Sequence, residues 1–334
     1  MEMNEIAELI KKHGSKADEE LKKLIPMNGD PLLQPYLNDP IWHHMGGGGK
    51  RIRPAMCLMT CEALGGKTED AMGFALATEI LHNFFLLHDD IEDGDTMRRD
   101  IPTVWVKYGL SNGINSGDYM IPQAYKAILN SKIDSTKLKK MLDVFTMTYE
   151  KTIEGQALDI NSRAKENFSI EEYIKIITLK TSYYLVFTLV GGAIAAGADD
   201  KVIQKIWKLG ENMGPAFQIR DDIIDLTEGK GRGGEIGCDI KESKPSILYA
   251  YVLNKANNEE KNKLLEIMKK ERNAKTQQEV DWIIKLYKKY DAIEFAQNYA
   301  DNLTKEAYKA IDEIPLKNKQ IFHDIARFIS ERKS

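Results

Sequence analysis

The chain has 334 residues, of which 43% are hydrophobic and 29% charged, and its formal net charge is -4. This balance is typical of soluble globular proteins and gives no reason to expect a nucleic-acid partner. The N-terminal segment MEMNEIAELIKK lacks the basic and apolar regions of a signal peptide. We therefore expect a cytoplasmic protein with one large domain, residues 1–334, and no transmembrane segment.

Helical periodicity runs along nearly the whole chain. Apolar residues recur at spacings of three and four, as in AMGFALATEILHNFFLLHDDIED, and no long stretch alternates with period two. We predict about ten helices, packed as a single large all-α bundle. Glycine-rich or polar breaks are expected at residues 45–49, 64–70, 109–118, 196–200 and 227–237. Residues 1–25 and 255–334 are predicted to form accessory amphipathic helices.

Two features of the core can be predicted from composition. The apolar tract Leu185–Ala198 is shorter than the ~20 residues that span a bilayer, so it predicts a buried helix. Cys57 and Cys61 share one predicted helix, without histidines at zinc-finger spacing. We expect the three cysteines of the chain to be reduced thiols in the core.

One short acidic pattern, Asp-Asp-x-x-Asp, occurs twice. The first copy is Asp89, Asp90 and Asp93, and the second is Asp221, Asp222 and Asp225. At ~100° per residue, each copy presents three carboxylates within one arc of a helix. Close carboxylates repel one another unless cations lie among them, and ligand sets of oxygen alone favour Mg²⁺, with Mn²⁺ as a second choice. The alternative for a single copy is a solvated acidic helix end, but both copies follow an apolar helical segment.

Basic residues accompany these acidic patterns. The segment GGGGKRIRP places Lys50, Arg51 and Arg53 beside flexible glycines, and Arg98 and Arg99 follow the first acidic copy. No strand precedes Lys50 and no serine or threonine follows it, which excludes a Walker phosphate loop. Since Mg²⁺ is often held by a few carboxylates together with phosphate oxygens, the combination predicts a Mg²⁺-diphosphate ligand.

A family resemblance follows from the order of the motifs. GGKRIRP, HNFFLLHDDIED with RR soon after, GQALD, KTS, FQIRDDIID and GCDIKESKPS occur in this order between residues 42 and 250. In this the chain resembles the trans-prenyltransferases, the isoprenyl diphosphate synthases that include farnesyl and geranylgeranyl diphosphate synthases. The resemblance implies an all-α bundle around a central cavity, of the isoprenoid synthase type, usually as a homodimer. It also implies Mg²⁺-dependent head-to-tail joining of isopentenyl diphosphate to an allylic diphosphate.

The resemblance also assigns roles to individual residues. The six aspartates of the two acidic copies would bind Mg²⁺ ions that hold the allylic diphosphate, which Arg98 and Lys180 would also contact. The diphosphate of isopentenyl diphosphate would be held by Lys50, Arg53, His82 and Arg99. His82 lies seven residues before Asp89 and so on the same helix face, although a lone histidine there is more often a core residue.

Three further residues complete the assigned site. Thr181 and Gln218 would turn oxygen dipoles toward a carbocation, and the alternative is that both only pack between helices. Lys244 matches a lysine of the family's substrate-binding region. Departures from the family pattern are Asp100 in place of glycine, Trp105 in place of histidine, and Gly234 with Glu235 where a loop lysine is expected. The last departure concerns how tightly the allylic diphosphate is held.

The aromatic pair Phe84 and Phe85 lies one turn before the first acidic copy. In the resembled family, aromatic residues at these places limit the product to a short chain, C15 or C20. Ordinary core packing would also place phenylalanine there. A growing product should extend along this helix toward its N-terminus, so the two rings would form the floor of the hydrocarbon cavity.

Three other functions compete with chain elongation. A class I terpene cyclase would carry an Asn/Ser/Glu-type second metal motif in place of the second acidic copy. A head-to-head synthase would lack the basic anchor at Lys50 and Arg53. A non-catalytic partner subunit should have lost acidic residues. Both acidic copies are complete, which favours elongation.

Overall fold

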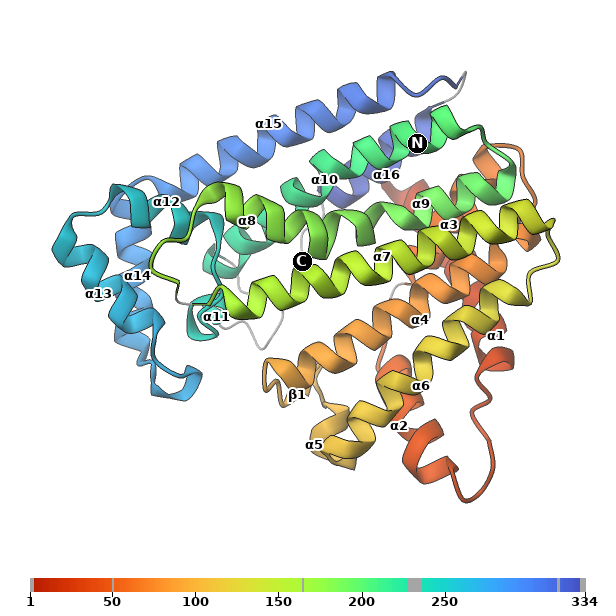
Figure 1. Cartoon of the computed structure of the whole chain (residues 1–334), viewed down its shortest axis with the longest axis horizontal. Helices are drawn as coiled ribbons and strands as arrows, with labels where there is room; N and C mark the ends of the chain where they lie inside the picture. The colour runs from red at the N-terminus through yellow and green to blue at the C-terminus, as the bar shows by residue number, and fades with distance from the viewer. Residues whose placement is uncertain (1–2, 50, 164, 228–235, 317–318, 331–334) are drawn as a thin grey trace. The chain divides into compact units, whose positions relative to one another are not determined.

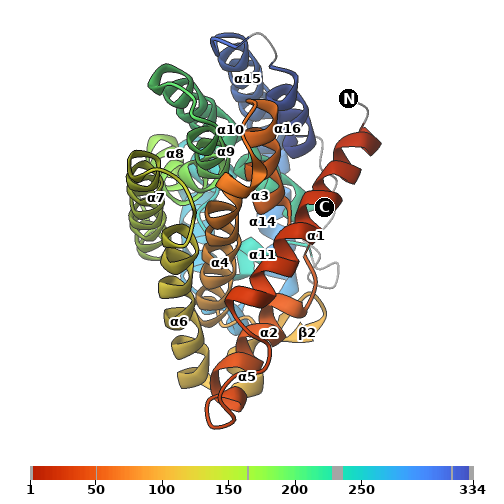
Figure 2. The same ribbon diagram turned by 90° about the vertical axis from the view of Figure 1, so that its right-hand side faces the viewer.

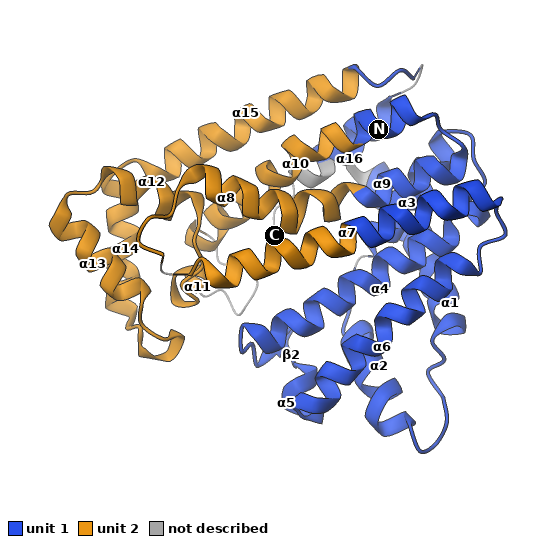
Figure 3. Cartoon of the chain, in the orientation of Figure 1, with its two compact units in different colours: residues 1–147, 187–206, 313–328 blue, residues 148–186, 207–312, 329–334 orange. Residues whose placement is uncertain are grey.

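The computed structural model describes residues 3–49, 51–163, 165–227, 236–316 and 319–330 (Figure 1). Nearly all regular structure in these residues is helical, which confirms the all-α prediction. The exception in the described part is a short hairpin, in which β1 (Met97–Arg98) pairs antiparallel with β2 (Ile101–Pro102). The chain forms two compact units, coloured separately in Figure 3. Unit 1 comprises residues 1–147, 187–206 and 313–328, and unit 2 comprises residues 148–186, 207–312 and 329–334.

Unit 1 contains the first six α-helices of the chain. These are α1 (Met3–Leu24), α2 (Asp39–Gly46), α3 (Ile52–Ala63), α4 (Thr68–Glu92), α5 (Val104–Tyr108) and α6 (Leu110–Leu129), with a π-helical turn at Gln34–Asn38. Helix α4 packs against α6 and α3, and α1 lies along α3, as Figure 2 shows. The helix that carries the first acidic copy is therefore held inside unit 1 by its neighbours.

Unit 1 also contains most of α9 (Tyr183–Ala196), which includes the predicted buried tract. Phe187 of α9 packs edge-on against Phe74 of α4, with ring centroids 5.7 Å apart. A Cβ atom on Gly192 would lie 2.3 Å from the carbonyl oxygen of Cys57, so only glycine permits this approach of α9 to α3. All three cysteines are buried and free, as predicted.

The predicted break at 109–118 is wrong beyond its first residue. Gly109 has a positive φ of 90° and ends α5, but the next residues already belong to α6. Gly113 and Gly117 lie where α6 crosses α4, and a Cβ on Gly117 would lie 2.2 Å from Nε2 of His88. The glycines therefore serve close helix packing, and tertiary contact outweighs their low helix propensity.

Among the described residues, three helices besides α9 have residues in both units. These are α7 (Ser135–Asn161), α10 (Asp200–Thr227) and α16 (Gln320–Ser330). Helix α8 (Ile170–Ile177) continues through a π-helical turn at Thr178–Ser182 into α9. Among the described residues this stretch, Ile170–Ala196, is long and apolar enough to span a membrane by length and composition, yet 72% of its apolar window is buried within the structure. Core helices of globular proteins pass the same test.

Unit 2 has its own hydrophobic core, centred on Tyr249, Tyr287 and Ile283. It contains α8 and the helices α11 (Cys238–Lys241), α12 (Ile247–Lys255), α13 (Asn258–Met268), α14 (Gln277–Lys289) and α15 (Ala292–Asp312), with a 3-10 turn at Arg272–Ala274. Side-chain caps start several of these helices; Thr276 and Glu279 form a reciprocal capping box at α14. In α14, Val280, Ile283 and Leu286 are buried at the spacing of an amphipathic helix.

Candidate active-site clusters

The first acidic copy lies at the C-terminal end of α4. Asp89 and Asp90 belong to the last turn, and Asp93 caps the helix, with its backbone N–H donating to the carbonyl oxygen of Asp89 over 2.8 Å. The three carboxylates are not equivalent, because Asp90 is 1% exposed while Asp89 and Asp93 are partly exposed. Sequence spacing alone did not reveal this difference.

Arg98, on the β1 strand, holds Asp90. Its Nε donates to Oδ1 of Asp90 over 2.6 Å. Burial raises the pKa of Asp90 to about 6 despite this arginine, and Asp89 and Asp95 add to the rise. Oδ2 of Asp90 is buried and has no hydrogen-bond partner among the described residues. A cation near this helix end would offset the cost of the buried charge.

Arginines and histidines form a second cluster in unit 1. Burial is the first cause that lowers the pKa of His82 well below its usual value, and the charges of Arg53, Arg99 and Arg98 lower it further. His82 is therefore neutral beside three cations, and can donate one hydrogen bond without a charge of its own. His44, which sequence reasoning missed, has its pKa lowered to about 3 by burial and by Arg98 and Arg99.

The predicted anion-binding residues are thus brought together in unit 1 as far as the described residues reach. Arg53, His82, Arg98 and Arg99 interact electrostatically around α4, and Arg99 also donates from Nη1 to the carbonyl oxygen of Gly48. Arg99 has a positive φ of 51°. Lys50 lies outside the described residues, and so do Gly234 and Glu235.

Protein groups occupy the guanidinium of Arg51, a cation of GGGGKRIRP. Nε donates to Asp18 over 2.7 Å, Nη1 to Glu79 over 2.9 Å, and Nη2 to the carbonyl oxygen of Met45 over 2.7 Å. Arg51 and Glu79 are 9% and 3% exposed. This residue therefore ties the glycine-rich loop to α1, α2 and α4.

The two phenylalanines before the first acidic copy form a small aromatic cluster. Their ring centroids lie 5.1 Å apart, and Phe84 lies 4.6 Å from the ring of His88. Phe84 is 5% exposed, whereas Phe85 is only partly buried. The packing role of Phe84 is thus evident, and Phe85 is the better candidate for contact with a ligand.

The second acidic copy lies on α10 in unit 2, and its second aspartate, like that of the first copy, accepts side-chain hydrogen bonds. The hydroxyl of Tyr173 donates to Oδ2 of Asp222 over 2.6 Å, and Nε2 of Gln218 donates to Oδ1 over 3.1 Å. Thr181 in turn donates to Oε1 of Gln218 over 3.3 Å. The predicted dipole pair Thr181 and Gln218 therefore forms a chain that ends on Asp222. Tyr173 was not predicted, because it lies 49 residues away in sequence.

The third aspartate of this copy is also bound internally. Asp225 is completely buried, and its Oδ2 accepts a hydrogen bond from the backbone N–H of Asp239 over 3.1 Å. Asp239 belongs to the GCDIKESKPS motif, so this bond joins two motifs that are separate in sequence. Asp221 is the partly exposed member of the copy.

Both predicted lysines of unit 2 form ion pairs. Lys180, in the π-helical turn, donates to Oδ2 of Asp159 over 2.7 Å, and Asp159 is the aspartate of GQALD. Lys244 lies 2.6 Å from Glu242, and Arg272 lies 3.5 Å from the same carboxylate. An anionic ligand would compete with Asp159 and Glu242 for these cations.

The donor set fits Mg²⁺ only in combination with a ligand. Among the described residues no three His, Cys, Asp or Glu side chains converge into a ready-made metal site. Mg²⁺ needs no such cage, since it commonly keeps several waters and takes one or two carboxylates plus phosphate oxygens. Asp89 and Asp93 in unit 1, and Asp221 in unit 2, are partly exposed, and each can supply such a carboxylate.

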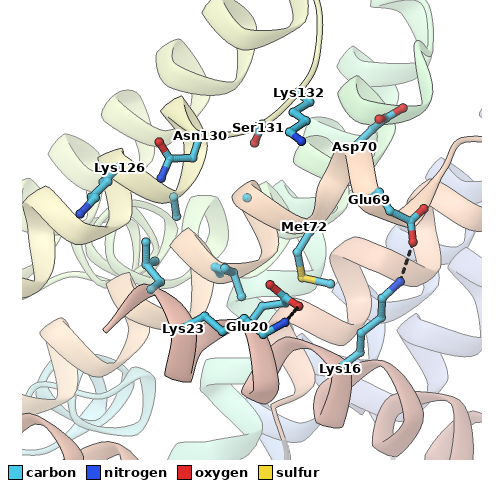
Figure 4. Close-up of a pocket in the computed structure, with 14 residues that line it drawn as sticks. Lys16, Glu20, Lys23, Glu69, Asp70, Met72, Lys126, Asn130, Ser131 and Lys132 are labelled. Atoms are coloured by element: carbon cyan, nitrogen blue, oxygen red, sulfur yellow. Dashed lines mark hydrogen bonds and ion pairs between the residues drawn. The ribbon is translucent and has the colours of Figure 1, made fainter. Parts of the chain in front are cut away.

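A pocket of about 570 Å³ lies elsewhere in unit 1, between α1, the start of α4 and the end of α6 (Figure 4). Lys16 and Glu69 form an ion pair of 2.8 Å there, as do Lys23 and Glu20 at 2.6 Å. None of the predicted site residues lines this pocket. Its mixed charges do not match the chemistry of the motifs.

Comparisons with known proteins agree with the motif order. A family model described as polyprenyl synthetase matches residues 34–287. The short chain isoprenyl diphosphate synthase of Methanothermobacter thermautotrophicus is 31% identical over 99% of this chain and 100% of its own length. The geranylgeranyl diphosphate synthase of Saccharolobus solfataricus is 34% identical over 89% of this chain and 90% of its own. Among solved structures, geranylgeranyl pyrophosphate synthetase from Pyrococcus horikoshii covers 100% of both chains with a TM-score of 0.89 and 32% identity.

Proposed function

Because the chain belongs to the polyprenyl synthetase family and is a prenyltransferase of the short-chain isoprenyl diphosphate synthase class, we propose that it makes a C20 product. It would join isopentenyl diphosphate to an allylic diphosphate, head to tail, until geranylgeranyl diphosphate is formed. The observation that carries the reaction is the presence of both complete acidic copies, each with its second aspartate held by a donor from another element. The product length is supported by relatives named as geranylgeranyl diphosphate synthases.

A C15 product is the second candidate, and the pair Phe84 and Phe85 favours it. Two aromatic rings 5.1 Å apart, one turn before the first acidic copy, would shorten a hydrocarbon cavity along α4. A product that stops at C15 is farnesyl diphosphate. The two candidates share the same chemistry and differ only in how many times the condensation is repeated.

We assign Mg²⁺ binding to the outward carboxylates of the two acidic copies, Asp89, Asp93 and Asp221. The bound Mg²⁺ would stabilise the negative charge that develops on the departing diphosphate. Asp90 and Asp225, whose oxygens accept hydrogen bonds from the protein, would hold the copies in shape, and Asp222, oriented by Tyr173 and Gln218, would add a carboxylate oxygen to the Mg²⁺ of the second copy. Mn²⁺ has the same preference for oxygen ligands and could replace Mg²⁺.

The basic residues bind the two diphosphates in this proposal. Arg98 and Lys180 contact the allylic diphosphate, and Arg53, Arg99 and Lys50 contact isopentenyl diphosphate. Neutral His82 adds a hydrogen bond without repelling its cationic neighbours. Thr181 and Gln218 direct oxygen dipoles at the allylic cation, and Lys244 contributes to diphosphate binding. The released diphosphate is the base that takes the final proton.

We also propose that the protein is a homodimer. Large apolar side chains are exposed around α6, including Leu110 at 52% and Ile114 at 41%. Leu33 precedes the π-helical turn that contacts α6 and is 53% exposed, and Tyr36 within that turn is 60% exposed. Exposed apolar side chains on adjoining elements are typical of an interface. Size-exclusion chromatography with light scattering would measure the mass, and a monomer of 37.9 kDa would contradict this part.

The reaction is tested by incubating the purified chain with Mg²⁺, radiolabelled isopentenyl diphosphate and a C5, C10 or C15 allylic diphosphate. We expect elongation with each starter and a C20 end product, with complete loss of turnover when EDTA removes the metal. Predominant C15 product would select the second candidate. Absence of elongation with every starter would contradict the proposed function.

A further inference from the structure

We propose that Tyr173 is a positioning residue that holds Asp222 so that the second acidic copy binds Mg²⁺ in the presence of a diphosphate. This inference rests on the proposed function, since it concerns the metal that the acidic copies are proposed to bind. Tyr173 would touch neither substrate nor metal. It would act through the carboxylate that accepts its hydrogen bond.

The position of Tyr173 is fixed by the core of unit 2. The residue is 2% exposed and belongs to the same apolar cluster as Ile176, Ile177 and Tyr249. Helix α8 begins at a side-chain cap, where Oγ of Ser169 accepts the backbone N–H of Glu172 over 3.1 Å. A buried tyrosine ring on an anchored helix has little rotational freedom. Its hydroxyl oxygen is therefore a fixed point, 2.6 Å from Oδ2 of Asp222.

The other oxygen of Asp222 is also held. Gln218 donates to Oδ1 over 3.1 Å, and Gln218 is itself bound by Thr181. Donors on both oxygens fix the plane of the carboxylate, which Tyr173 or Gln218 alone would not do. Partners of this kind orient metal ligands and commonly matter nearly as much as the ligands themselves.

The chemical type of the donor distinguishes the two acidic copies. Asp90 of the first copy is held by the guanidinium of Arg98, which cancels its charge, whereas Asp222 is held by a neutral hydroxyl and a neutral amide. Neither of these two donors carries a charge that would neutralise the carboxylate. A tyrosine is suited to this task because it fixes the carboxylate without neutralising it.

A purely structural role for the hydroxyl is the alternative, and the chain offers a matched control. Tyr249 lies in the same core, is completely buried, and donates its hydroxyl to the carbonyl oxygen of Lys165 over 3.0 Å. The substitutions Tyr173→Phe and Tyr249→Phe each remove one buried hydroxyl and one hydrogen bond. They differ in the group that loses the hydrogen bond, which is a carboxylate of an acidic copy for Tyr173 and a backbone carbonyl for Tyr249.

The experiment compares the wild-type chain with both variants. Binding of Mn²⁺ in the presence of inorganic pyrophosphate is followed by electron paramagnetic resonance, which requires no turnover, and the Mg²⁺ concentration for half-maximal elongation is measured in parallel. We expect Tyr173→Phe to weaken Mn²⁺ binding roughly tenfold or more and to raise the Mg²⁺ midpoint by a similar factor. Tyr249→Phe should leave both values unchanged while lowering the melting temperature comparably.

Equal metal affinities for Tyr173→Phe and wild type, or equal shifts in both variants, would overturn the proposal. Should Tyr173→Phe fail to fold, Gln218→Met removes the donor to the other oxygen, and wild-type Mn²⁺ affinity in that variant would overturn it as well. If the wild-type chain elongates no substrate, the proposed function fails separately, because the Mn²⁺ measurement still reports on Tyr173.

Discussion

Nη1 of Arg51 lies 2.9 Å from Oε1 of Glu79, and both side chains are buried. Asp18 of α1 accepts a hydrogen bond from Nε of the same guanidinium over 2.7 Å, and the carbonyl oxygen of Met45 in α2 accepts one from Nη2. Arg51 therefore connects three helices of unit 1, α1, α2 and α4. Buried ion pairs are costly to break from one side, because the partner is left as an uncompensated charge. This makes Arg51 a structural member of a motif whose other cations are proposed to bind substrate.

The first prediction concerns this pair. Arg51→Met should lower the free energy of unfolding by about 3–5 kcal/mol, since Glu79 and Asp18 would lose their common donor. The exposed pair Lys139 and Asp143, 2.6 Å apart on α7, is the control, and Lys139→Met should cost under about 0.5 kcal/mol. Urea unfolding followed by circular dichroism measures both. Equal small losses would mean that the buried pair does not stabilise the loop.

The second prediction concerns the helix crossing of α4 and α6. Gly117→Ala places a Cβ 2.2 Å from Nε2 of His88, whose ring is held at 4.6 Å by Phe84. Overpacking of this kind should destabilise the protein by about 1–3 kcal/mol. Gly46→Ala is the control, because no atom lies within 4 Å of its added Cβ. That variant should unfold at the wild-type urea concentration or slightly above it, and a loss equal to that of Gly117→Ala would refute the packing argument.

The sequence could predict what depends on local pattern. The periodicity around Phe74 and Leu76 predicts α4, and the spacing of Asp89, Asp90 and Asp93 places them together on one helix end. The same local reasoning failed for residues 110–118, because the role of Gly117 depends on a histidine of another helix. Propensity treats such a glycine as a break, whereas close packing requires it inside the helix.

The candidate site divides in the same way. Residue types and spacing predicted the aspartates and arginines, but not that Asp90 in the first copy, and Asp222 and Asp225 in the second, are buried. The hydrogen bonds to Asp90 and Asp222 come from Arg98 and Tyr173. Tyr173 reaches Asp222 only after α8 and α10 have packed. The internal binding of Arg51 likewise depends on α1, which carries none of the motifs.

The third prediction concerns product length. Phe85→Ala should shift the products toward longer chains. Removal of the partly exposed ring would open space along α4, on the N-terminal side of the first acidic copy. Phe295 of α15, which stacks on Tyr251 at 4.1 Å in unit 2, provides a control in which an aromatic ring is lost elsewhere. Chromatography of the dephosphorylated products gives the chain-length distribution. If Phe85→Ala and wild type give the same distribution, the floor of the cavity lies at other residues.

The fourth prediction concerns acid stability through His44. Burial and the charges of Arg98 and Arg99 lower its pKa from 6.5 to about 3, so the folded state favours the neutral ring. Between these two values the unfolded chain binds more protons than the folded chain, and stability must therefore fall as the pH falls from 6.5 toward 3. At pH 5 the loss from this residue should be about 2 kcal/mol relative to pH 7.5.

His44→Gln removes the titrating group and keeps a polar side chain beside the backbone of Asn83, with which His44 forms a hydrogen bond. The neighbouring His82, whose pKa is lowered by burial, by three arginines and by His44, titrates in both proteins. The free energy of unfolding, measured in urea at pH 7.5 and pH 5, should drop by about 2 kcal/mol less in the variant than in the wild type. An identical drop in the two proteins would show that His44 is already protonated in the folded state near pH 5, and that the arginine cluster around it is less electropositive than its geometry indicates.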